Sequence, residues 1–86
     1  MKIKESFLIH ESGEETLLVP TGNAPFSGIV RGNNTLGAIL KQLQKGTTED
    51  ELVSAVCAEY EAEREIVERD VKKVLTTLRE IGALDE

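Results

Sequence analysis

The spacing of apolar residues along the chain changes near residue 33, and this change predicts two structural halves. Before it, apolar residues come in short runs separated by glycines and prolines, which is typical of β-strands joined by turns. After it, apolar residues recur every three or four positions and proline is absent, which is typical of amphipathic helices. The sequence therefore predicts an α+β fold with three short N-terminal β-strands followed by three α-helices.

The first half predicts a hairpin and one further strand. Residues 2–10 alternate loosely between apolar and polar, and residues 16–19 form a β-prone run that a proline ends. Residues 12–14, Ser-Gly-Glu, predict the turn between them, since Ser-Gly between two β-prone runs favours a tight hairpin. Residues 21–27 contain glycine, asparagine and proline and predict a loop. Residues 28–31, Gly-Ile-Val-Arg, predict the third strand.

The second half predicts three helices with recognisable ends. Asn33 or Asn34 can cap the first helix, which is expected to end at Gly46. Thr48 is followed three residues later by a glutamate, which is the spacing of a capping box for the second helix. The third helix is expected to end at Gly82. The expected apolar faces of the three helices are, in order, Leu36, Ile39, Leu40 and Leu43; Leu52, Val53, Val56, Cys57 and Tyr60; and Ile66, Val67, Val71, Val74, Leu75, Leu78 and Ile81.

The junction between the second and third helices has two interpretations. Positions 53, 60, 67, 74 and 81 are apolar and seven apart, which would suit one continuous coiled-coil helix. However, residues 61–65, Glu-Ala-Glu-Arg-Glu, interrupt the apolar face for a full turn, and their acids suit the N-terminus of a new helix. A break near residues 61–64 is therefore the favoured interpretation.

Length and charge limit the kind of protein that this sequence can be. Its 86 residues predict a single domain, 1–86, with little volume for a deep catalytic pocket. The net charge of −6 divides into +1 for residues 1–47 and −7 for residues 48–86, and an acidic surface repels polyanions such as nucleic acid and anionic membranes. No stretch approaches the roughly 18 apolar residues of a membrane span or resembles a signal peptide, so a cytoplasmic location is expected.

The sequence offers no constellation of residues for catalysis or metal binding. Cys57 is the only cysteine, and its helical spacing from Val53 and Tyr60 predicts a buried small hydrophobe and not a nucleophile. His10 is the only histidine and belongs to a different expected element. The glutamates of residues 59–65 predict a solvated face. We therefore expect no enzymatic activity, no metal and no cofactor.

An ordered set of short motifs runs through residues 28–84. It comprises a short strand with a following asparagine, a capped helix, a second capped helix, and a third helix with a characteristic ending. Its members are Gly28-Ile29-Val30-Arg31-Gly32-Asn33, Thr35, Ile39-Leu40, Leu43, Gly46, Thr48, Glu51, Leu52-Val53, Tyr60, Asp70-Val71, Val74-Leu75, Leu78, Gly82 and Leu84. This set resembles the PqqD family, the leader-binding subunit of pyrroloquinoline quinone (PQQ) biosynthesis, also called the RiPP recognition element.

The resemblance implies a winged-helix-like, non-catalytic domain that binds the leader segment of a ribosomally made precursor peptide. It also implies that the domain presents this peptide to a modifying enzyme, such as a radical SAM enzyme. In that family the leader adds as an extra strand to the open edge of the third strand, beside the third helix. Main-chain hydrogen bonds then supply affinity, and side-chain pockets supply selection. The expected peptide-binding residues are Ile29, Val30 and Arg31 on the strand, and Asp70, Lys73, Thr77 and Ile81 on the helix.

Two other functions stay open at this point. A winged-helix-like fold is also used by DNA-binding regulators, although the charge of −7 on the helical half argues against that reading. A dimerising coiled-coil adaptor would follow if the last two helices were one continuous helix.

Overall fold

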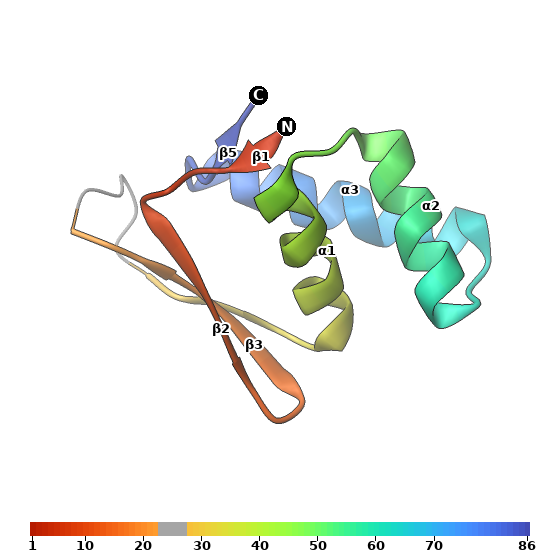
Figure 1. The fold of residues 1–86 in the computed structure, drawn as a ribbon, viewed down its shortest axis with the longest axis horizontal. Helices are drawn as coiled ribbons and strands as arrows, with labels where there is room; N and C mark the ends of the chain where they lie inside the picture. Colours follow the sequence, from red (N-terminus) through yellow and green to blue (C-terminus); the bar gives the residue numbers. More distant parts are fainter. Residues whose placement is uncertain (23–27) are drawn as a thin grey trace.

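The structure, a computed structural model, describes residues 1–22 and 28–86, and in it a three-stranded sheet packs against helices (Figure 1). The predicted α+β fold, with an N-terminal three-stranded sheet followed by three helices, is confirmed. The elements are β1 (Lys2–Ile3), β2 (Phe7–Ser12), β3 (Glu15–Pro20), β4 (Val30–Gly32), α1 (Asn34–Lys45), α2 (Glu49–Tyr60), α3 (Arg64–Glu80) and β5 (Leu84–Asp85).

The main sheet is antiparallel, with strand order β2-β3-β4. The β2–β3 hairpin closes on the pair Ser12–Glu15, so its loop is the two residues Gly13 and Glu14, within the predicted turn. Gly13 has φ +61°, a conformation that glycine adopts without steric cost and that the first central residue of a type II′ turn requires. β4 pairs with β3 through Leu17–Arg31 and its two neighbouring pairs. β4 therefore forms one edge of this sheet.

The predicted strand over residues 2–10 is wrong in one respect, because two strands occupy this segment. A turn closed by the hydrogen bond from the Phe7 amide to the Lys4 carbonyl (3.1 Å) separates β1 from β2. β1 instead pairs with β5 at the far end of the chain, so the two termini lie side by side (Figure 1). The Arg79 guanidinium donates to the Glu86 carboxylate (2.9 Å), and this hydrogen bond lowers the pKa of that carboxyl.

The third strand lies later than predicted. The register with β3 begins at Leu18–Val30 and ends at Thr16–Gly32, so the strand covers residues 30–32 and not 28–31. The loop predicted over residues 21–27 lies outside the described residues except at its first two positions.

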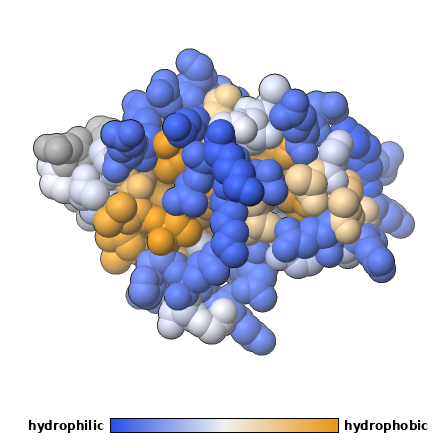
Figure 2. Space-filling view, viewed as in Figure 1, coloured by the Kyte–Doolittle hydropathy of each residue, from blue (hydrophilic) through white to orange (hydrophobic). Residues whose placement is uncertain are grey.

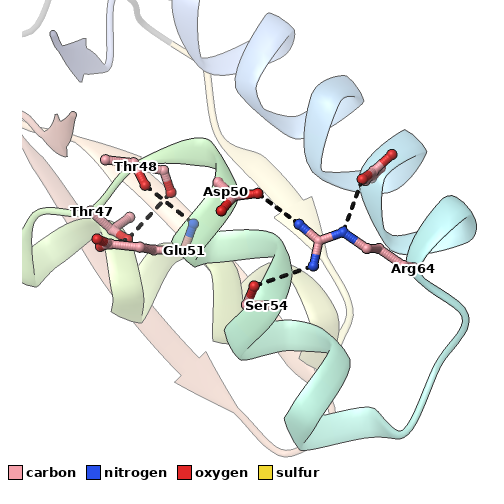
Figure 3. Close-up of polar contacts among 7 residues, drawn as sticks. Thr47, Thr48, Asp50, Glu51, Ser54 and Arg64 are labelled. Carbon is pink, nitrogen blue, oxygen red and sulfur yellow. Dashed lines mark hydrogen bonds and ion pairs between the residues drawn. The ribbon is translucent and has the colours of Figure 1, made fainter.

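The predicted caps of the first two helices are present. The Asn33 side chain accepts hydrogen bonds from the Thr35 and Leu36 amides (3.1 and 3.3 Å), and the Thr48 hydroxyl accepts one from the Glu51 amide (3.2 Å). In the second helix, however, the Glu51 carboxylate accepts from the hydroxyl of Thr47 (3.3 Å), a pairing that the capping-box pattern does not predict (Figure 3).

The predicted break between the second and third helices is confirmed. Glu61 ends α2 in the left-handed conformation, with φ 51° and ψ 36°, so a continuous coiled-coil helix is excluded. Arg64, at the start of α3, then holds the two helices together (Figure 3). Its guanidinium donates to Asp50 (2.7 Å) and Ser54 (3.3 Å) on α2 and to Glu68 (3.1 Å) on α3.

The core collects most of the predicted apolar faces, but five of their residues are not fully buried. Ile66 is 49% exposed because it shares one side of α3 with the exposed residues Asp70, Lys73 and Thr77. Tyr60 is 41% exposed, and its hydroxyl donates to the Asn34 carbonyl (3.0 Å). Cys57, Val74 and Ile81 are half-buried. The buried cluster comprises Ile3, Phe7, Leu18, Leu36, Ile39, Leu40, Leu43, Leu52, Val53, Val56, Val67, Val71, Leu75, Leu78, Ala83 and Leu84.

The face drawn in Figure 2 is mostly hydrophilic; its most hydrophobic surface lies on the side of the strands, and a paler apolar area lies over the helices. Leu8, on β2, is 59% exposed, and Ile29, just before β4, is 53% exposed. Across residues 1–22 and 28–86, no helix has both the length and the apolar character needed to cross a membrane.

Candidate functional site

A groove of about 460 Å³ runs between the edge strand β4 and the helix α3, with α1 beneath it. Three elements that are distant in sequence therefore build it. β4 and the α1 cap contribute one wall, and α3 contributes the other. Its lining residues are Val30, Arg31, Gly32, Asn33, Thr35, Leu36, Ile39, Asp70, Lys73, Val74, Thr77 and Leu78.

The groove has an apolar floor and a polar rim. Leu36, Ile39 and Leu78 are buried, and Val30 and Val74 are half-buried, so the floor is continuous with the core. Asp70, Lys73 and Thr77 are exposed at intervals of three and four residues, which places them along one side of α3. Within residues 1–22 and 28–86, neither Asp70 nor Lys73 makes an ion pair. Such a surface can accept an apolar side chain and select the charges around it.

The strand register shows which backbone groups of β4 face the groove. A two-residue hairpin closes on a hydrogen-bonded pair, here Ser12–Glu15, and hydrogen-bonded pairs alternate from there. The hydrogen bond from the Thr21 amide to the Ser6 carbonyl (2.8 Å) continues this alternation. The odd-numbered residues of β3 therefore bond to β2, and its even-numbered residues face β4.

The same alternation applies to the pairs between β3 and β4. Val30 and Gly32, opposite the even-numbered residues Leu18 and Thr16, direct their backbone groups at β3. Arg31 directs its N–H and C=O away from β3, toward the open edge. Because β4 has β3 as its only strand neighbour among the described residues, the Arg31 backbone is the centre of an unpaired edge.

Gly32 allows β4 to come close to α1. A Cβ atom at this position would lie 2.4 Å from the Leu36 Cδ2 atom and 2.8 Å from its Cβ atom. No side chain fits there without displacing α1 or the strand. Gly32 therefore keeps the edge of the sheet against the floor of the groove.

The structure brings together five of the seven residues predicted for peptide binding. Val30, Arg31, Asp70, Lys73 and Thr77 all line the groove. Their role in binding stays a prediction.

The other two predicted residues lie outside the lining of the groove. Ile29 is exposed just before β4, and Ile81 is half-buried at the end of α3, packed against the core. Sequence reasoning also missed the α1 wall. Leu36 and Ile39 were expected only as a core-facing stripe, and no sequence signal distinguishes a core residue from one at a groove floor.

Over residues 1–22 and 28–86, no group of three or more His, Cys, Asp or Glu side chains is placed to hold a metal ion. The Cys57 thiol lies on α2 and the His10 imidazole on β2.

The fold and the groove define a class of winged-helix-like α+β domain with an open strand edge beside a helix. The family model described as "Coenzyme PQQ synthesis protein D (PqqD)" matches residues 7–84, and the chain belongs to this family. None of the curated proteins compared with this chain matches it.

Two solved structures are similar to this chain over nearly its whole length. "TbiB1 in Complex with the TbiA(beta) Leader Peptide" is 28% identical, with a TM-score of 0.74, covering 99% of this chain and 100% of that one. "Lasso peptide synthetase B1 complexed with the leader peptide" is 22% identical, with a TM-score of 0.73, covering 95% of this chain and 93% of that one. The second likeness bears on the fold alone.

Proposed function

We propose that this chain binds the leader segment of a ribosomally made precursor peptide in the groove between β4 and α3. The leader adds to β4 as a fourth strand of the sheet. The observation that carries this proposal is the unpaired edge at Arg31, which opens onto the apolar floor. Membership of the PqqD family supports it, as does the likeness to TbiB1, whose structure is a complex with a leader peptide.

The free energy of leader binding has to come from both the strand edge and the apolar floor of the groove. Two main-chain hydrogen bonds at Arg31 contribute about 1 kcal/mol each, net of the water they replace. A dissociation constant of about 1 μM corresponds to a net binding free energy of about 8 kcal/mol, and the favourable interactions must exceed this by the entropic cost of association. Burying one apolar side chain adds about 1.5–3 kcal/mol. The hydrogen bonds of the strand edge therefore supply part of the affinity and set the register of the peptide, and side chains that reach the floor must supply the rest.

The chain is proposed to act without chemistry of its own, as a carrier for a modifying enzyme. Its one cysteine and one histidine lie on different elements, and Cys57 packs partly into the core. The enzyme partner that the family suggests is a radical SAM enzyme, and the proposed location is the cytoplasm. Neither nucleic acid nor membrane is proposed as a partner, since residues 48–86 carry a charge of −7.

Calorimetric titration tests this function. A short precursor peptide is first sought among the genes beside this one, and the purified chain is titrated with the synthetic leader segment of that peptide. We expect one-to-one binding with a dissociation constant in the micromolar range or tighter. The matched control is the remaining, core segment of the same precursor, which is expected to give no binding heat. Equal binding of both segments, or no binding of the leader at millimolar concentration, would contradict the proposal.

A further inference from the structure

Successive side chains of β4 point to opposite faces of the sheet. Val30 and Gly32 stand opposite Leu18 and Thr16, which are 1% and 2% exposed, so this side of the strand faces the helices. Arg31 stands opposite Leu17 and shares its side, the outer face of the sheet. The Arg31 side chain is accordingly 73% exposed.

A peptide strand added to β4 inherits this alternation. Residues that are directly opposite in a sheet point to the same face, whether the strands are parallel or antiparallel. The peptide residue opposite Arg31 therefore points to the outer face. Its two neighbours, opposite Val30 and Gly32, point toward the groove floor, which includes Leu36 and Val74.

The Arg31 guanidinium has capacity for a further partner. Within the described residues its only ion pair is with Glu15, at 3.9 Å from Nε to the carboxylate oxygen, and Glu15 lies diagonally across on β3. A guanidinium carries five N–H donors in a planar fork, which suits a carboxylate. Opposite charges on neighbouring strands stabilise their pairing, and like charges weaken it.

We infer that the groove recognises a three-residue pattern, apolar–acidic–apolar, whose central Asp or Glu pairs with Arg31 on the outer face. This inference rests on the proposed strand addition and names the class of leader that it selects. The two apolar residues of the peptide occupy the floor of the groove. The central acid prevents the peptide from shifting along β4 by one residue. A shift of one position would turn the acid toward the apolar floor, where an unpaired charge is strongly disfavoured.

The test uses a phage-displayed library of random 12-residue peptides, selected on the immobilised full chain. We expect the selected peptides to share the alternating pattern with Asp or Glu at its centre. On Arg31→Glu the central preference should change to Lys or Arg, while the apolar positions stay the same. Arg31→Gln, which keeps the length of the side chain without its charge, should lose the central preference without reversing it.

Lys72→Glu is the matched control, because it reverses an exposed charge on α3 that lies outside the lining of the groove. It should leave the central acid preferred. For one selected peptide, Arg31→Glu should weaken binding by about 3- to 10-fold, and replacing the peptide's acid with Lys should recover that loss. Both variants are exposed-site changes, and circular dichroism verifies that they fold.

The outcomes separate this inference from the function on which it rests. Alternating peptides whose central residue does not respond to the charge at Arg31 overturn the inference and leave strand addition intact. If the unaltered chain selects no common extended pattern, both are contradicted.

Discussion

Arg31→Pro is expected to weaken leader binding by at least about tenfold while the domain stays folded, and Val30→Pro is expected to damage the fold itself. The Arg31 amide points to the open edge, so proline there removes no hydrogen bond of the free protein. It does remove the donor that an added strand needs, and its ring obstructs that strand. Val30, one residue earlier, already has the extended conformation that a following proline requires.

Val30→Pro removes an N–H that faces β3 and leaves the Leu18 carbonyl, in the buried part of the sheet, without its donor. An unsatisfied buried group costs about 1–3 kcal/mol, a large share of the stability of so small a domain. Circular dichroism melting and calorimetric titration of both variants provide the measurement. Arg31→Ala is the control that keeps the amide and loses only the side chain. A folded Arg31→Pro variant that binds leader with unchanged affinity would exclude β4 as the docking edge.

Leu75→Ala is expected to lower the free energy of unfolding by about 3 kcal/mol. Leu75 is fully buried on α3, and truncation removes its transfer free energy and leaves a cavity that neighbouring helices fill only in part. Ile66, on the same helix, is 49% exposed, so Ile66→Ala deletes a similar side chain at much smaller cost, under about 1 kcal/mol. Urea unfolding of the two variants compares them directly. Similar losses for both would contradict this account of how α3 packs.

Much of the fold could be predicted from signals within single segments of the sequence. Asn33 and Thr48 cap their helices because a short polar side chain there satisfies exposed amides, a requirement that is independent of the rest of the chain. The break after Tyr60 was predictable for a similar reason, since the acidic run that follows leaves no apolar face to bury. Gly13, between two β-prone runs, supplied the backbone freedom of the hairpin turn.

Features that depend on pairing between distant segments were not predictable. β5 is two residues long, too short for any alternation, and exists because β1 lies beside it. The position of β4 was two residues in error at its start because register comes from its partner β3, where Leu18 and Thr16 face the core. The floor of the groove depends on how α1 and α3 meet, which no single segment encodes.

For the site, the resemblance to the PqqD family contributed what the local patterns did not. Asp70, Lys73 and Thr77 share one side of a predicted helix, and that observation alone suits a solvated flank equally well. Their place beside β4 emerges only when the sheet and α3 are assembled around α1. The direction of the Arg31 backbone required the register of all three strands.

Amide hydrogen exchange at three neighbouring residues tests strand addition most directly. In the free protein, the Val30 and Gly32 amides face β3 and should exchange slowly, whereas the Arg31 amide faces the open edge and should exchange fast. With saturating leader peptide, the Arg31 amide is expected to become protected by at least about tenfold, while the Val30 and Gly32 amides continue to exchange slowly. An Arg31 amide that exchanges equally fast in the free and the saturated protein would contradict leader binding by addition to β4.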